Sequence, residues 1–277
     1  MLNPFEIDAF SMTSLTASIN ILPNNYGRCR EMNLFPEKGV STRSIIVEEQ
    51  NGVLNLLPTL PVGSPGTQNK MGKRKVRTFN IPHIPLDDVI LPSEYDGVRA
   101  FGTENQVSGP AQIMNDHLQA AKNKFGITIE HLRMGALKGI ILDADGSTLY
   151  NLYTEFGITP KEVPFALTVD ETDVRSKCLT VNRHIEDNLM GEVMSKVYAL
   201  CSEGFFDALI SHPEVEKAFL YHSEASERLG GDPRKGFKFG GITFEEYRGT
   251  ATDGNGTDRK FIAADEAHAF PMGTMET

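Results

Sequence analysis

The 277-residue chain carries a formal net charge of -10, with 40% hydrophobic and 23% charged residues. This composition is typical of a folded soluble protein, and no apolar run approaches the roughly 20 residues that span a bilayer, so we expect no membrane segment. The acidic balance disfavours extensive binding to DNA phosphates, because such binding needs a net basic face. Three widely spaced cysteines, none in a CxxC motif, indicate buried thiols rather than disulfides or a zinc site: Cys29, Cys178 and Cys201.

The first elements along the chain are predicted to be a short helix and a β-hairpin. Residues 13–22, TSLTASINIL, begin with a hydroxyl cap and place three apolar side chains on one helical face: Leu15, Ile19 and Leu22. In RSIIVEEQNGVLNLLP, residues 43–58, two apolar runs meet at Asn51 and Gly52, a dipeptide that suits a type I′ turn. We therefore expect strands on both sides of this turn, and a further strand at KVRTFNI, residues 75–81.

A basic stretch interrupts this β-type region. Residues 61–81 hold no acidic residue and five basic ones: Lys70, Lys73, Arg74, Lys75 and Arg77. The stretch could be a solvated loop, a nucleic-acid patch, or a contact with another protein. The only nearby aromatic residue is Phe79, whereas nucleic-acid patches usually interleave several aromatics. A two-stranded arm is marginally stable alone, so we predict that it lies on another copy of this acidic protein.

Long helices and short strands follow. Apolar residues recur at helical spacing from Ser108 to Leu137, so we expect one nearly continuous helix over about 108–137. GIILDADGSTLYNLY predicts strand, turn and strand, VPFALTV predicts a strand, and a second helical stripe is made by Val174, Cys178, Val181, Ile185 and Leu189. Shorter helical patterns continue to about Ser226, and the last fifty residues read as Gly-rich loops with strands such as ITFEEYR and FIAADEA. This order predicts an α+β protein, not a doubly wound sheet.

The motif ILDADGSTL, residues 141–149, resembles the first motif of the haloacid-dehalogenase phosphatases. In such an enzyme Asp143 would be the nucleophile and Asp145 the acid and base, with Asp265 and Glu266 completing a Mg²⁺ site. However, that motif normally leads into a helix, whereas another strand follows here, so a hairpin turn is the favoured interpretation. His117 lies on the apolar stripe of the long helix, as a hydrogen-bonded core histidine would, and we predict no metal, cofactor or catalytic residue.

Several long segments together resemble the major capsid protein E family of tailed bacteriophages and prophages, the lambda-type head protein. They are NILPNNYGR at 20–28, IIVEEQNGVLNLLPTLPVGSPGTQN at 45–69, KVRTFNIPHIPLDDVILPSEYDGVRAFG at 75–102 and ALKGIILDADGSTLYN at 136–151. The resemblance covers nearly the whole chain. It implies the tailed-phage major capsid protein fold, also called the Johnson fold.

This resemblance implies a division of the chain into four parts. They are an N-terminal arm at 1–42, a projecting hairpin called the E-loop at 43–90, a peripheral domain at 91–174 that contains the spine helix at about 108–137, and an axial domain at 175–277. Lys70, Lys73, Arg74, Lys75 and Arg77 would lie at the tip of the E-loop, where they would contact a neighbouring subunit. Because family members continue past AFPMGTMET, we expect the axial domain to be incomplete at its C-terminus.

The implied function is that of a major capsid protein rather than an enzyme. Copies of the chain would assemble in the host cytoplasm into the icosahedral shell of a virion, around double-stranded DNA that is not bound sequence-specifically. Scaffolding, decoration and portal proteins are the other implied partners. The alternatives that the residues leave open are a Mg²⁺-dependent phosphatase using Asp143 and Asp145, and a nucleic-acid-binding module whose affinity falls steeply with salt.

Overall fold

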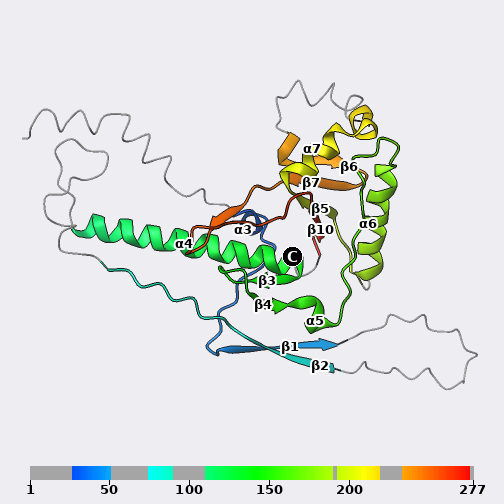
Figure 1. Ribbon diagram of the computed structural model, residues 1–277. Helices are drawn as coiled ribbons and strands as arrows, with labels where there is room; N and C mark the ends of the chain where they lie inside the picture. Colours follow the sequence, from blue (N-terminus) through cyan, green and yellow to red (C-terminus); the bar gives the residue numbers. More distant parts are fainter. Residues whose placement is uncertain (1–26, 51–73, 90–109, 190–191, 219–232, 275–277) are drawn as a thin grey trace, which may run out of the picture. The chain divides into compact units, whose positions relative to one another are not determined.

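The computed structural model describes residues 27–50, 74–89, 110–189, 192–218 and 233–274 (Figure 1). The chain forms two compact units, and each is built from separate stretches of sequence. Unit 1 comprises Met1–Leu34, Pro85–Thr159 and Gly249–Phe261, and unit 2 comprises Phe35–Ile84, Pro160–Arg248 and Ile262–Thr277. Among the helices that are described, none is long and apolar enough to cross a membrane.

Unit 1 is organised around one long helix, α4 (Pro110–Lys138). Its other elements are α3 (Arg28–Glu31), β3 (Ile140–Leu142), β4 (Thr148–Asn151), α5 (Leu152–Phe156), β8 (Thr250–Thr252) and β9 (Asp258–Lys260). Proline at the first position suits a helix start, because its missing N–H would have no helical partner there. After Lys138 the chain turns sharply at Gly139, where φ is 84°, and enters β3. The long helix and the strand–turn–strand predicted after it are both confirmed.

A buried polar contact fixes α3 to α4. The backbone N–H of Cys29 donates to Glu130 Oε1 at 2.7 Å, and Cys29 Sγ lies 3.3 Å from Met134 Sδ. All three side chains are almost completely buried. A carboxylate that is removed from water needs hydrogen-bond donors, and the start of α3 supplies one. Helix α3 is therefore attached to the C-terminal part of α4.

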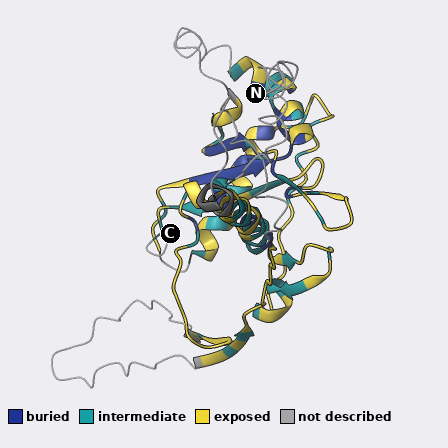
Figure 2. Ribbon diagram, turned by 90° about the vertical axis from the view of Figure 1, so that its left-hand side faces the viewer, coloured by how far each residue is buried: buried dark blue, intermediate teal, exposed yellow. Residues whose placement is uncertain are grey.

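Unit 2 contains a mixed four-stranded sheet in the order β10–β5–β7–β6. The strands are β5 (Lys196–Cys201), β6 (Phe237–Phe239), β7 (Ile242–Glu246) and β10 (Ala267–Met272). β5 runs parallel to β7, whereas β10 pairs antiparallel with β5 and β6 pairs antiparallel with β7. Helices α6 (Val174–Asn188) and α7 (Glu203–Ser211) contribute to one buried apolar cluster with the sheet, whose central strands β5 and β7 are mostly buried (dark blue in Figure 2).

The caps of these helices explain where they begin. The Asp173 side chain accepts from the Ser176 N–H at the start of α6, and the Ser202 side chain accepts from the Phe205 N–H at the start of α7. The apolar stripe that predicted α6 is confirmed, with Val174 and Cys178 fully buried. Long helices and mainly antiparallel strands occupy separate stretches, so the predicted α+β class is confirmed.

Three local predictions in unit 2 are wrong. Residues 163–169, VPFALTV, form no strand: Phe165 and Leu167 pack against the core, but Pro164 has no N–H to donate and Ala166 adopts a positive φ of 49°. FIAADEA is a turn with Asp265 at φ 62°, and β10 begins only at its last residue. β5 lies where helical patterns were expected, because a strand buried on both faces shows no alternation of apolar and polar residues.

The three cysteines are free and buried, as predicted. Burial raises the pKa of the Cys29 and Cys178 thiols to about 12, and it also raises the pKa of Cys201. Since only the thiolate is reactive, we expect iodoacetamide at pH 8 to label none of the three in the native protein and all three after denaturation. Because folding raises these pKa values, protonated thiols favour the folded state. Their contribution to the free energy of unfolding should be complete below pH 9, the pKa of an unperturbed thiol, and should fall between pH 9 and 12. Mass spectrometry gives the labelling, and stoichiometric labelling of the native chain would contradict the predicted burial.

Candidate functional site

Unit 2 carries a two-stranded ribbon that is largely exposed. Strand β1 (Ser44–Gln50) pairs antiparallel with β2 (Arg74–Asn80), and the two form a sheet of their own. The strand predicted at KVRTFNI is thus confirmed as β2. The turn at Asn51 and Gly52 and the strand expected after it lie outside the described residues, and β2 is the partner that the structure shows for β1.

The register gives the ribbon two different faces. Side chains alternate along a strand, and directly paired residues share a face. One face carries Ile45 and Val47 opposite Phe79 and Arg77, and most of these side chains are half-buried. The other carries Ile46 opposite Thr78 and Glu48 opposite Val76, and all four are exposed. We call this second set the exposed face of the ribbon; Figure 2 shows how much of β1 and β2 is exposed.

Two large apolar side chains dominate the exposed face. Ile46 is 66% and Val76 is 60% exposed, and the register places them as diagonal neighbours. Leaving two adjacent aliphatic side chains in water on a ribbon that is only marginally stable alone is unfavourable. The exposed face therefore has the character of a surface that another molecule covers. Sequence reasoning did not select Ile46 or Val76, because the alternation in the two strands acquires a meaning only when their register is known.

The five predicted contact residues do not form one patch of equivalent positions. Lys70 and Lys73 lie outside the described residues. Arg74 is the first residue of β2. Since positions alternate between the two faces of a strand, position 74 belongs to the opposite face from Lys75 and Arg77. Lys75 stands opposite Glu49 and Arg77 opposite Val47, both on the face that also carries Phe79. The structure thus brings Lys75 and Arg77 together on one face and separates Arg74 from them.

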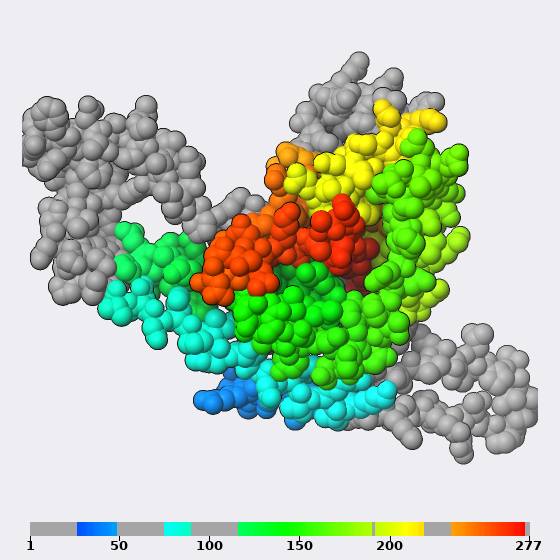
Figure 3. Space-filling model, in the orientation of Figure 1, coloured from blue at the N-terminus to red at the C-terminus, as the bar shows by residue number. Residues whose placement is uncertain are grey.

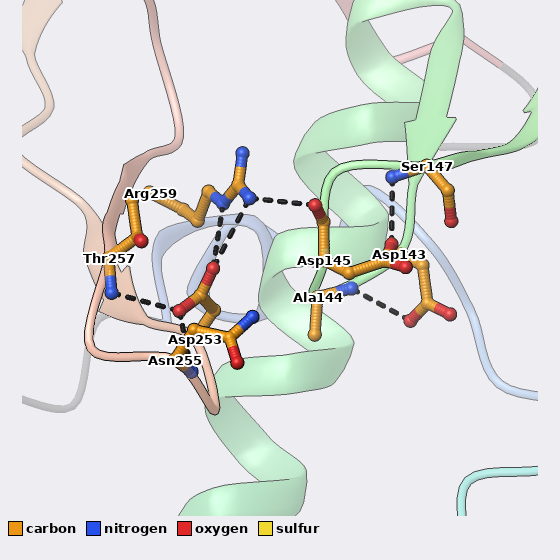
Figure 4. Close-up of polar contacts among 8 residues, drawn as sticks. All are labelled: Asp143, Ala144, Asp145, Ser147, Asp253, Asn255, Thr257 and Arg259. Atoms are coloured by element: carbon orange, nitrogen blue, oxygen red, sulfur yellow. Dashed lines mark hydrogen bonds and ion pairs between the residues drawn. The ribbon is translucent and has the colours of Figure 1, made fainter.

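The phosphatase-like motif lies in the turn between β3 and β4, and its carboxylates are used within the turn. Asp143 Oδ1 accepts from the Ala144 N–H at 2.7 Å, and Asp145 Oδ1 accepts from the Ser147 N–H at 2.8 Å (Figure 4). The hydrogen bonds from Ser147 are the main reason that the pKa of Asp145 lies below its ordinary value. The contact of Asp145 with Ser147 is that of an Asx-type turn, in agreement with the hairpin interpretation.

A second turn meets the first through Arg259. The Asp253 carboxylate accepts from the backbone N–H groups of Asn255 and Thr257, at 2.9 and 2.8 Å, and pairs with the Arg259 guanidinium at 3.2 Å. The amide of Thr257 is the main cause that holds the pKa of Asp253 below its ordinary value. Arg259 Nη2 also donates to the backbone carbonyl of Asp145 at 2.7 Å (Figure 4). No sequence pattern indicated a contact between Asp145 and Arg259, which are more than one hundred residues apart.

This contact attaches the β8–β9 hairpin to the rest of unit 1. In Figure 3 the orange atoms of the hairpin lie directly against the green atoms of α4 and the β3–β4 turn. Phe261, which follows β9, is fully buried, and its ring centroid lies 5.4 Å from that of His131 on α4. Arg259 and Phe261 are therefore structural contacts of unit 1.

The remaining residues of the phosphatase hypothesis serve other contacts. Asp265 lies in a turn of unit 2, and Glu266 Oε2 lies 3.3 Å from His268 Nε2. His117, predicted in the core, is instead half-exposed and hydrogen-bonded to Asp88 at 2.9 Å. Within the described ranges, no three His, Cys, Asp or Glu side chains are grouped as metal ligands would be.

Comparison with known proteins indicates a structural protein rather than an enzyme. Residues 11–277 match the family described as phage major capsid protein E. The chain belongs to this family. The major capsid protein of Pseudomonas phage KPP10 is 31% identical over 282 residues, which cover 96% of this chain and 80% of the relative. The major capsid protein of Salmonella phage Felix O1 is 27% identical over 300 residues, which cover 99% of this chain and 81% of the relative.

Membership of the capsid protein E family gives the chain a structural role in the capsid of a phage particle. Members of this family are structural proteins, not enzymes, and they assemble with copies of themselves into a shell. Neither relative supports the phosphatase alternative. The functional surfaces of such a subunit are the ones that meet its neighbours.

Proposed function

We propose that the chain builds the icosahedral head of a tailed phage around double-stranded DNA, and that the β1–β2 ribbon is the stem of an E-loop lying on a neighbouring subunit. The observation that carries this proposal is the exposed face of the ribbon, with Ile46 and Val76 in water. Burial of each side chain would contribute about 1–2 kcal/mol. A specific contact buries on the order of 1,600 Å² in total, so other surfaces must contribute as well.

Weak individual contacts suffice for a closed shell. Each subunit in a symmetric assembly makes several contacts at once, and after the first contact the others form at a high effective concentration. The four-part division into arm (1–42), E-loop (43–90), peripheral domain (91–174) and axial domain (175–277) stays a prediction, with α4 as the proposed spine helix. Assembly in the host cytoplasm, and contacts with scaffolding, decoration and portal proteins, belong to the same proposal.

The basic residues of the ribbon would orient this contact. A subunit of net charge -10 offers acidic surface to its neighbours, so Lys70, Lys73, Arg74, Lys75 and Arg77 have complementary charge. Electrostatic attraction of this kind directs encounter more than it adds affinity. We therefore assign the basic residues a guiding role and the apolar pair the main stabilising role.

Reversing two of these charges tests that assignment. In a chain with Lys75→Glu and Arg77→Glu, we expect the protein concentration needed for assembly to rise about tenfold, with little change in thermal unfolding, since exposed ion pairs contribute only about 0–1 kcal/mol each. The assembly threshold of the variant with Lys75→Gln and Arg77→Gln should lie between the thresholds of the doubly reversed protein and of wild type. Light scattering against protein concentration measures the threshold. An unchanged threshold in the doubly reversed protein would remove Lys75 and Arg77 from the proposed contact.

A further inference from the structure

His131 lies where the β8–β9 hairpin meets α4, and its imidazole ring is partly buried. The ring centroid is 5.4 Å from that of Phe261, which follows β9 and is fully buried. Its Nε2 atom is buried and, within the part of the chain that the structure describes, has no hydrogen-bond partner. A charged imidazolium donates from both ring nitrogens, so burial of Nε2 without an acceptor penalises the charged ring more than the neutral one.

The charged groups around the ring also oppose its protonation. Burial is the largest cause that lowers the pKa of His131, and two cations lower it further: Lys138, at the end of α4, and Arg259, in β9. Backbone groups of Leu142 and Asp143, in the β3–β4 hairpin, favour the charged ring, but they do not outweigh the other causes. Three elements that meet at this point therefore bear on the same proton.

The carboxylates on these elements are used by other groups. Glu130 accepts from the Cys29 N–H, and Asp143 accepts from the N–H of the following residue in its own turn. Asp145 and Asp253 have pKa values below the ordinary 3.8, so the stability that they contribute is present above pH 3.8 and is lost only as the pH falls further. The range between pH 7 and 5 therefore separates the effect of His131 from theirs.

The lowered pKa makes the packing of the hairpin depend on pH. When the hairpin leaves α4, the ring regains water and its ordinary pKa of 6.5, so below this pH the open state binds more protons than the closed state. The free energy that holds the hairpin closed is thus complete above pH 6.5 and falls as the pH decreases from 6.5 towards the lowered pKa. The opening equilibrium constant can rise by at most about tenfold for each pH unit.

We propose that His131 makes the contact between the β8–β9 hairpin and α4 acid-sensitive, so that uptake of a proton by its ring releases the hairpin. Because Arg259 links this hairpin to the Asp145 carbonyl, release would also free the turn between β3 and β4. All of these residues belong to unit 1, so the device operates in the single subunit and does not depend on the contact proposed for the ribbon.

Hydrogen exchange of the unassembled full-length chain at pH 7 and pH 5 tests this proposal. The probe is the Phe261 amide, which donates to the Gly249 carbonyl at 2.9 Å, and its rate is corrected for the intrinsic effect of pH. We expect its opening equilibrium constant to be at least about threefold, and at most about thirtyfold, larger at pH 5. His131→Gln should abolish this rise, because the amide side chain does not titrate.

The matched control is His117→Gln, which removes a half-exposed histidine of the same helix and should leave the rise unchanged. His117 is 14 residues from His131, about 21 Å along the helix. An opening constant that is the same at pH 7 and pH 5 in the wild-type chain would overturn the proposal. The same rise in His131→Gln as in wild type would also overturn it.

Nuclear magnetic resonance of the wild-type chain gives a test that needs no variant. The ring signals of His131 can be assigned through their proximity to the Phe261 ring. At pH 6 a histidine of ordinary pKa is mostly protonated, whereas we expect the His131 ring of the closed hairpin to keep the chemical shift of the neutral form. A mostly protonated ring at pH 6, still in contact with Phe261, would contradict the proposal.

Discussion

A chain with Ile46→Asp and Val76→Asp is expected to fold normally and to form no shells. In the subunit both side chains already face water, so the exchange costs the fold little. In the proposed contact each new carboxylate would lose its hydration without gaining a partner, which costs several kcal/mol, and the penalty would recur at every equivalent contact of the shell. Electron microscopy and sedimentation report assembly, and circular dichroism reports the fold.

The control for this experiment preserves the apolar pair. Ile46→Val combined with Val76→Ile exchanges the two side chains across the exposed face of the ribbon and keeps its apolar area, so this protein should assemble with near-wild-type yield. Shells of normal yield from the doubly acidic protein would show that the exposed face meets no neighbour. Failure of both proteins to assemble would show instead that the ribbon is sensitive to any change, which would contradict a contact made through apolar area.

The second large effect is expected at Phe261. Phe261→Ala should lower the free energy of unfolding of unit 1 by about 3–5 kcal/mol, because it removes a fully buried aromatic side chain and leaves a cavity beside His131. The residue also closes the β8–β9 hairpin, since its N–H donates to the Gly249 carbonyl at 2.9 Å. Alanine keeps this N–H, so the substitution removes only the side-chain packing against α4, and we expect that loss to loosen the last stretch of chain that completes unit 1.

Hydrogen exchange can localise this loss. We expect amides of α4 and of the β3–β4 hairpin to exchange at least about one hundredfold faster in Phe261→Ala, while amides of β5 and β7 in unit 2 keep their rates. Phe261→Leu, which keeps most of the apolar volume, should behave much more like wild type. Equal acceleration in both units would mean that they unfold together, and the assignment of Phe261 to unit 1 alone would be wrong.

Elements whose apolar residues recur at a regular spacing were predictable from sequence. The helical spacing from Ser108 to Leu137 matches α4 within two residues, and the stripe from Val174 matches α6. The DADG turn was also identified, because Asp and Gly at a strand end favour tight turns and another strand follows. In each of these cases the information lies within a few neighbouring residues.

The elements that depend on distant partners were not predictable. β5 pairs with β7 and β10, which lie far away in sequence, and it is buried along nearly its whole length, so its apolar run carries no alternation. The segment around Phe165 has the alternation of a strand but lacks a partner strand in the described chain. The contact of Arg259 with the Asp145 carbonyl joins residues 114 positions apart and leaves no local pattern.

The candidate site was also predictable from sequence only in part. The basic composition of residues 61–81 drew attention to the ribbon, and the family resemblance implied a subunit contact there, which stays a prediction. The comparisons support the capsid function. However, the interpretation from composition grouped Arg74, Lys75 and Arg77 in one patch, whereas the pairing of β1 with β2 places position 74 on the other face of the ribbon. The same pairing identifies Ile46 and Val76 as the apolar centre of the exposed face.

Hydroxyl-radical footprinting of Ile46 and Val76 tests the central claim most directly. Purified subunits and assembled particles of the same chain are exposed to the same radical dose, and oxidation at each side chain is quantified by mass spectrometry. In the subunit both side chains should react readily, in line with their exposed fractions of 66% and 60%. In the particle, oxidation of both should fall about tenfold or more, as for side chains buried in a subunit contact. Equal oxidation of Ile46 and Val76 in subunit and particle would contradict the proposal that the ribbon lies on a neighbouring subunit.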